Sequence, residues 1–128
     1  MVGEWLMTKE AVTKALIVDD EAEIRQLVSR FLQKAGHHTE TSDSLAAARD
    51  QLLTGLYDVV LLDLHLPDGV GFDLIPAIRK HSPKAKVVII TAYEGPEEQH
   101  GALLHQVDDY LKKPFTKQQI LDTLDRLL

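Results

Sequence analysis

The stretch Val59–Gly71, VVLLDLHLPDGVG, decides how the rest of the chain is interpreted. Its first four residues are apolar strand formers, and the run ends on the carboxylate of Asp63. A short continuous apolar run is typical of a strand that is covered on both faces. A carboxylate at the end of such a strand is costly unless a cation or hydrogen-bond donors meet it. The sequence therefore predicts a buried strand that delivers Asp63 to a polar site.

The same pattern recurs along the chain, with helical spacing between the apolar runs. Strands are expected at residues 15–18, 37–41, 58–63, 87–90 and 109–112, the second being a weak edge strand. Helices are expected at residues 24–35, 44–55, 72–81, 96–105 and 120–128. Pro76 fits the third helix if Asp73 lies near its N-cap, because a proline is tolerated in the first turn. This alternation predicts a doubly wound α/β domain with a parallel sheet.

Polar side chains follow the predicted strands, at the points where the strands end. They are Asp19, Asp20, Asp63, Thr91 and Lys113. Because the strands of a parallel sheet point the same way, these residues should gather at one edge, where such folds bind ligands. Carboxylates on adjacent strands suit Mg2+ and do not suit zinc. A lysine and a threonine nearby can hold phosphoryl oxygens while an Asp oxygen acts as nucleophile, so the set predicts an aspartyl-phosphate site.

From residue 15 to residue 128 the chain resembles the response-regulator receiver domain of two-component signalling. The motifs that carry the resemblance are Asp19-Asp20, Leu61-Leu62-Asp63 with Pro67 and Gly71, Ile90-Thr91-Ala92, and Asp109-Tyr110-Leu111-Lys112-Lys113-Pro114-Phe115. The resemblance implies a flavodoxin-like, five-stranded parallel sheet in the order 2-1-3-4-5, with helices on both faces. It also implies a signalling phosphoacceptor rather than an enzyme.

The resemblance assigns roles to the residues at the strand ends. Asp63 would take a phosphoryl group from a sensor histidine kinase or a phosphotransfer protein. The implied metal ligands for Mg2+ are Asp63, Asp20, the His65 backbone carbonyl, and Asp19 through a metal-bound water. Thr91 and Lys113 would grip the phosphoryl group, and Tyr110 would be the aromatic switch residue. Phosphorylation would then remodel the face formed by the fourth helix, the last strand and the fifth helix.

Two further positions are expected to set the lifetime of the phosphorylated form. His65 and Tyr93 should flank the path of the attacking water, and two bulky rings should obstruct it. Slow decay is therefore expected. The alternative is that a neutral imidazole at His65 orients the water as a base.

Two local features lead to specific structural expectations, one at Lys113 and one at the turn of residues 105–107. Lys113 is preferred to Lys112 because the lysine of this family directly precedes a proline that follows a cis peptide bond. His105-Gln106-Val107 stands where the family often has Ala-Gly-Ala. Without a glycine to adopt a positive φ, this turn should be strained or rebuilt.

Composition bounds the remaining possibilities. The 128 residues suit one domain, expected at residues 14–128 after a loose leader at residues 1–13. The chain has no cysteine and no apolar run long enough for a bilayer, which favours a cytoplasmic protein without membrane contact. The net charge of -6 argues against direct nucleic-acid binding. The output is expected from a downstream effector or from a further domain beyond Leu128.

Rival functions can be weighed on the same residues. A flavodoxin-type nucleotide binder would need a glycine-rich phosphate loop where Asp19-Asp20-Glu21 stands. A haloacid-dehalogenase-like phosphatase would need a second Asp where His65 stands, so it is disfavoured. A receiver-shaped module that is never phosphorylated stays open. The last helix has few basic residues, so a monomer, or a dimer formed through another surface, is expected.

Overall fold

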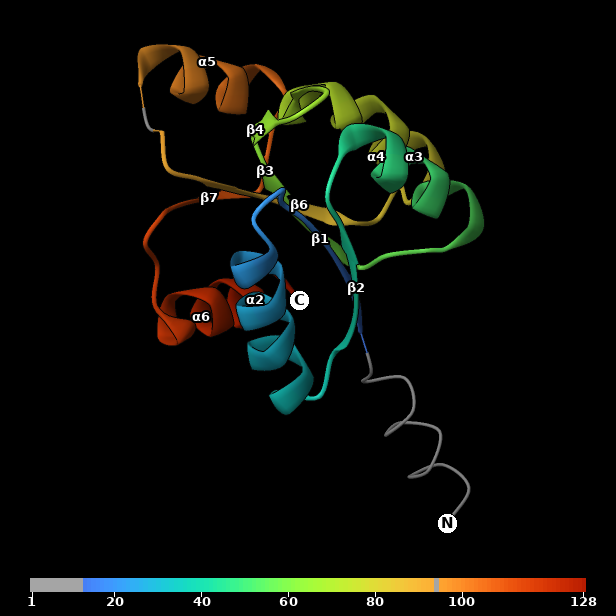
Figure 1. The fold of residues 1–128 in the computed structure, drawn as a ribbon, viewed down its shortest axis with the longest axis vertical. Coiled ribbons are helices and arrows are strands. Elements are labelled where there is room, and N and C mark those ends of the chain that lie inside the picture. Colours follow the sequence, from blue (N-terminus) through green and yellow to red (C-terminus); the bar gives the residue numbers. More distant parts are fainter. Residues whose placement is uncertain (1–12, 94) are drawn as a thin grey trace.

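A five-stranded parallel sheet forms the centre of the computed structural model, which describes residues 13–93 and 95–128 (Figure 1). Its strands are β1 (Lys14–Val18), β2 (His38–Ser42), β3 (Val59–Asp63), β6 (Lys86–Thr91) and β7 (Asp109–Lys112). They pair in the order β2-β1-β3-β6-β7. Counted along the chain, these five strands have the order 2-1-3-4-5, so the predicted topology is confirmed.

Helices cover both faces of the sheet, as predicted. On one face lie α2 (Ala22–Lys34) and α6 (Lys117–Leu127) (Figure 1). On the other lie α3 (Leu45–Thr54), α4 (Ile75–His81) and α5 (Pro96–Leu104) (Figure 1). None of the helices in the described part of the chain is long and apolar enough to cross a membrane.

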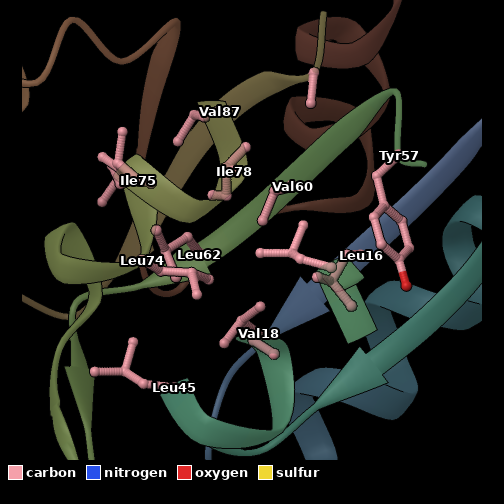
Figure 2. Close-up of a cluster of buried hydrophobic side chains, with 14 of the residues drawn as sticks. Leu16, Val18, Leu45, Tyr57, Val60, Leu62, Leu74, Ile75, Ile78 and Val87 are labelled. Carbon is pink, nitrogen blue, oxygen red and sulfur yellow. The ribbon is translucent and has the colours of Figure 1, made fainter. Parts of the chain in front are cut away.

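The sheet separates two apolar cores, because successive side chains of a strand point to opposite faces. Leu16, Val60 and Val87 belong to the core beneath α3 and α4, which Figure 2 shows in close-up. The neighbouring residues Ile17 and Leu61 belong to the core beneath α2 and α6. Both cores are almost fully buried, so the strands are held firmly and their ends are positioned reproducibly.

The helix boundaries follow the local sequence signals. Gly36, just past α2, has φ of 96°, and the Ser44 hydroxyl accepts a hydrogen bond from the Ala47 N–H at the start of α3. Pro76 lies in the first turn of α4, as expected. The segment around Phe72 was expected to be α-helical, but it forms the 3-10 turn η1 (Gly71–Leu74) that leads into α4.

A short hairpin after β3 was not expected from the sequence. It consists of β4 (His65–Leu66) and β5 (Gly69–Val70), which pair antiparallel. The carboxylate of Asp68 at its tip accepts hydrogen bonds from the backbone N–H groups of Leu45 (2.9 Å) and Ala46 (3.0 Å). These N–H groups have no partner within α3, so the hairpin caps that helix and is fixed in place.

The turn before β7 is rebuilt around a strained residue. Gln106 has φ of 55°, so a non-glycine residue takes the left-handed conformation. The Arg79 side chain donates hydrogen bonds to the carbonyl oxygens of His105 (3.2 Å) and Gln106 (3.0 Å) and braces the turn. After β7, the peptide bond between Lys113 and Pro114 is cis, as the family resemblance implied. At the other end of the chain, the expected leader lies outside the described residues except for Thr13.

Candidate functional site

The site lies at the carboxyl edge of the sheet, where four strand ends meet. Asp63 is the last residue of β3 and Thr91 the last residue of β6. Asp19 directly follows β1, and Lys113 directly follows β7. Asp19, Asp63 and Thr91 are buried. The parallel strands therefore bring together residues that lie up to 94 positions apart in the sequence.

The Lys113 ammonium group occupies the centre of the charged cluster. Its Nζ atom lies 2.7 Å from Asp19 Oδ2, 3.0 Å from Glu21 Oε1 and 3.3 Å from Asp63 Oδ2. The Lys113 side chain is only 10% exposed, so its attractions to the buried Asp19 and Asp63 are weakly screened by water. One cation thus links two carboxylates from the loop after β1 with the carboxylate at the end of β3.

Backbone groups fix the two buried carboxylates. The Glu21 N–H donates to Asp19 Oδ1 (2.8 Å), and the His65 N–H donates to Asp63 Oδ1 (3.3 Å). Gly71 packs against the backbone of Asp63, where an added Cβ atom would lie 2.1 Å from the Asp63 carbonyl oxygen. No other residue type fits at Gly71 without moving the loop after Asp63.

The electrostatics of the cluster are unfavourable for its carboxylates. Burial raises the pKa of Asp63, the nearby Asp19 charge raises it further, and Lys113 offsets only part of this. Burial also raises the pKa of Asp19, against a hydrogen bond from Lys113 that lowers it. Burial alone would lower the pKa of Lys113, but its carboxylate partners raise it above the usual range. The cluster therefore has a charged ammonium and an excess of poorly compensated negative charge.

Four acidic residues could together hold a cation. One carboxylate oxygen from each of Asp19, Asp20, Glu21 and Asp63 lies within 4.8 Å of the others. Asp20 and Glu21 are exposed, so a hydrated ion can reach them. An all-oxygen donor set with room for water suits Mg2+.

A pocket of about 250 Å³ opens above Asp63. It is lined by Asp20, Glu21, Asp63, His65, Ala92, Tyr93 and Lys113. The rings of the lining residues His65 and Tyr93 contact each other, with centroids 4.3 Å apart and planes tilted by 57°. The two residues expected to flank the water path thus form a joint aromatic wall.

The two expected switch residues meet at the backbone of Tyr93. The Thr91 hydroxyl accepts a hydrogen bond from the Tyr93 N–H (3.3 Å). The Tyr110 hydroxyl donates a short hydrogen bond to the Tyr93 carbonyl oxygen. Any movement of the loop after β6 therefore changes the hydrogen bonds of both the Thr91 and the Tyr110 side chains.

The residues predicted from the sequence all lie at this edge of the sheet, but one participant was missed. Glu21 was noted as part of an acidic run, and no role was assigned to it. In the structure its carboxylate contacts Lys113. The available signal was that Glu21 is the third consecutive acidic residue after β1. This signal is weak, because acidic residues at the start of a helix are common for electrostatic reasons alone.

Comparison with known proteins agrees with this geometry. The family model "Response regulator receiver domain" matches residues 15–125. Response regulator protein PilR of Pseudomonas aeruginosa is 39% identical over 101 residues, which is 79% of this chain and 23% of PilR. Transcriptional regulatory protein YxdJ of Bacillus subtilis is 36% identical over 86% of this chain and 48% of its own length. The chain thus spans about a quarter to a half of the length of these curated relatives.

Solved structures show the same fold over nearly their full length. The chemotaxis protein CheY4 of Vibrio cholerae has a TM-score of 0.85 at 32% identity, over 92% of this chain and 100% of CheY4. Response regulator TrrA of Thermotoga maritima, solved in complex with Mg2+ and BeF, has a TM-score of 0.80 at 30% identity. The match covers 91% of this chain and 99% of TrrA.

Proposed function

The chain belongs to the response-regulator receiver domain family, and we propose that its Asp63 is the residue that accepts the phosphoryl group. Phosphoacceptance in two-component signalling is the function of this family. The observation that supports Asp63 is that this buried carboxylate lines the pocket, 3.3 Å from the Lys113 ammonium and beside the acidic group. Asp20 and Glu21 are exposed, whereas Asp63 is buried and is itself the last residue of β3.

The acidic residues would hold Mg2+ beside Asp63. The ligands would be Asp20, Asp63 and the His65 carbonyl, with Asp19 acting through water. The bound cation would neutralise the excess negative charge of the cluster and the phosphoryl oxygens. Support comes from the oxygen-only donor set and from the relative TrrA, which was solved with Mg2+ and BeF.

In the proposed transfer, an Asp63 carboxylate oxygen attacks the phosphorus of a phosphohistidine. The new O–P bond forms as the P–N bond breaks. The electron pair of the P–N bond stays with the imidazole nitrogen of the donor. Lys113 stabilises the phosphoryl oxygens, and Thr91 would donate its hydroxyl hydrogen to one of them. The donor would be a sensor histidine kinase or a phosphotransfer protein, and the chain would act as a signalling phosphoacceptor rather than as an enzyme.

The switch would spread from Thr91 to the surface formed by α5, β7 and α6. A Thr91 side chain drawn toward the phosphoryl group would disturb the Tyr93 loop and release Tyr110 to turn inward. The helix α5 has no buried residue, and Leu103 and Leu104 on it are exposed, so little packing opposes its movement. The readout would be a downstream effector or an output domain, in the cytoplasm and without direct nucleic-acid or membrane contact by this domain.

The aromatic wall supports a slow-decaying phosphorylated form. His65 and Tyr93 contact each other beside Asp63, where an attacking water would have to pass. His65→Ala should therefore speed the loss of phosphate from Asp63. A variant that loses phosphate more slowly than the parent would contradict this.

Intact-mass spectrometry tests the proposed function. With acetyl phosphate and Mg2+, the protein should gain one acid-labile phosphoryl group, and Asp63→Asn or chelation of Mg2+ should abolish the gain. Asp125→Asn, an exposed carboxylate on α6, is the matched control and should behave as the parent. Equal labelling of the Asp63→Asn variant would refute the assignment, and no labelling of the parent by any donor would favour a passive interaction module.

A further inference from the structure

Glu21 is a charged residue of the site that the proposed chemistry leaves without a role. Its carboxylate lies 3.0 Å from Lys113 Nζ, although the side chain is 59% exposed. It occupies the N-cap position of α2 but makes no side-chain capping hydrogen bond. Helix capping therefore does not explain the orientation of this side chain, and its contact within the described structure is with the lysine.

The ammonium group of Lys113 is shared among three carboxylates. It donates hydrogen bonds to Glu21 and Asp63 and forms an ion pair with Asp19. A phosphoryl group on Asp63 adds new oxygens that must also be neutralised by Lys113. These oxygens compete with the carboxylates of Asp19 and Glu21 for the ammonium group.

Burial decides which contact is exchanged. The Asp19 side chain is 0% exposed, so breaking its pair with Lys113 leaves a buried carboxylate without its cation. Phosphorylated Asp63 no longer carries a carboxylate charge, so its contact with Lys113 passes to the phosphoryl oxygens. Glu21 faces solvent, so its carboxylate is rehydrated on release, and exposed ion pairs contribute little. Glu21 is the partner that Lys113 gives up most easily.

We propose that Glu21 is a positioning residue that competes with the phosphoryl group for the Lys113 ammonium, and so limits how readily Asp63 is phosphorylated. The proposal rests on the proposed function and adds a regulator to the same site. In the unphosphorylated protein Glu21 holds Lys113 toward α2, and phosphorylation transfers that hydrogen bond to a phosphoryl oxygen. The side chain at this position then tunes the balance between the two forms.

Three variants separate the contact from the charge. Glu21→Gln weakens the contact with Lys113 and removes one charge. Glu21→Asp keeps the charge but is one methylene shorter, so it no longer reaches Lys113. Glu23→Gln removes the same charge from an exposed position in the first turn of α2 and should behave as the parent.

The measurement is the rate of phosphorylation by acetyl phosphate at Mg2+ concentrations that saturate each variant, together with the affinity for beryllofluoride. Both Glu21 variants should react about two- to fivefold faster than the parent, the range that corresponds to one exposed ion pair. Both should also bind beryllofluoride more tightly. The advantage should shrink at high salt, because salt screens the exposed pair in the parent.

The outcomes distinguish this inference from the proposed function. If the parent gains a phosphoryl group on Asp63 but Glu21→Gln reacts no faster than Glu23→Gln, the inference is overturned. A Glu21→Asp variant that stays at the parental rate would overturn it as well, because charge alone would then explain the effect. Failure of the parent to be phosphorylated would refute the proposed function itself.

Discussion

Two clusters of charged and polar side chains lie beside the same sheet, and they are built on opposite principles. At the site, Lys113 faces Asp19, Glu21 and Asp63. In the second cluster, which we call the Glu40 cluster, one carboxylate has two partners. Glu40 accepts a hydrogen bond from the Tyr57 hydroxyl (2.5 Å), and its other oxygen lies 2.9 Å from Lys14 Nζ.

The difference appears in the direction of the pKa shifts. Hydrogen bonds from Tyr57 and Lys14 lower the pKa of Glu40, so folding favours its charged form. Burial and a neighbouring charge raise the pKa of Asp63, so folding disfavours its charged form. The Glu40 cluster stabilises the fold, whereas the site holds negative charge that a cation or a ligand can relieve. This is the pattern expected where function rather than stability selects the residues.

The largest effect is expected from removing the cation of the site. Lys113→Met should lower the free energy of unfolding by about 3 kcal/mol at pH 7, because it leaves buried carboxylates without a partner. The loss should shrink in acid as these carboxylates become protonated. Chemical denaturation at pH 4 and pH 7 measures this, with the exposed Lys84→Met as control. If Lys113→Met were as stable as the parent at pH 7, the buried carboxylates of the site would not depend on Lys113, and the contrast with the Glu40 cluster would be wrong.

Removing a carboxylate from the site should have the opposite sign. Asp63→Asn should stabilise the protein by about 1 kcal/mol at pH 7, as often occurs when a functional charge is removed. Because the folded pKa of Asp63 is raised, the penalty of its charge appears as pH rises above the usual Asp value of about 3.9 and is complete above the folded pKa.

The gain from Asp63→Asn should therefore disappear near pH 3, which thermal unfolding at several pH values can follow. Addition of Mg2+ should stabilise the parent more than the variant. A variant that is less stable than the parent at pH 7 would contradict the assignment of unfavourable charge to this edge.

A smaller loss is expected in the Glu40 cluster. Tyr57→Phe removes a hydrogen bond to a carboxylate and should cost about 1 kcal/mol at pH 7. The folded pKa of Glu40 is lowered, so this contribution is present at neutral pH and is lost as pH falls through that pKa. In a Glu40→Gln background the cost of Tyr57→Phe should be smaller, and a double-mutant cycle without coupling would refute the interaction.

The smallest effect should come from the exposed cation of the Glu40 cluster. Lys14 is 35% exposed and Glu40 40% exposed, so their ion pair is well screened. Lys14→Met should cost about 0.5 kcal/mol at low salt and nothing measurable at high salt. A loss as large as that of Lys113→Met would mean that exposure does not separate the two lysines.

The sequence was informative about the site because strand ends are easy to locate. Asp63 and Asp19 terminate apolar runs, and parallel topology alone places such residues at one edge. Lys113 could be chosen over Lys112 only through the family resemblance. The predicted strand order is confirmed, and the structure places these three residues at or just after the ends of β1, β3 and β7.

Other contacts depend on geometry that no local pattern contains. The pairing of Tyr57 with Glu40 spans 17 positions and requires the arrangement of β1, β2 and β3. The hairpin at residues 65–70 has strands of two residues, too short for any periodicity to be seen. Glu21 was overlooked because its reach to Lys113 depends on how α2 begins relative to β7. Gln106 shows the reverse case, since the missing glycine correctly predicted an unusual turn.

The division of the interior by the sheet has a consequence for how this sequence can change over time. Adjacent residues of one strand, such as Leu16 and Ile17, belong to different cores that share no side-chain surface. Energetic effects of substitutions usually add when the sites have no common neighbours. Substitutions that change side-chain volume in one core therefore need no compensating substitutions in the other core, provided that the backbone of the strand does not move. The two cores can then change in sequence independently while the strand ends keep their positions. Most core substitutions therefore leave the geometry of the site at the sheet edge unchanged.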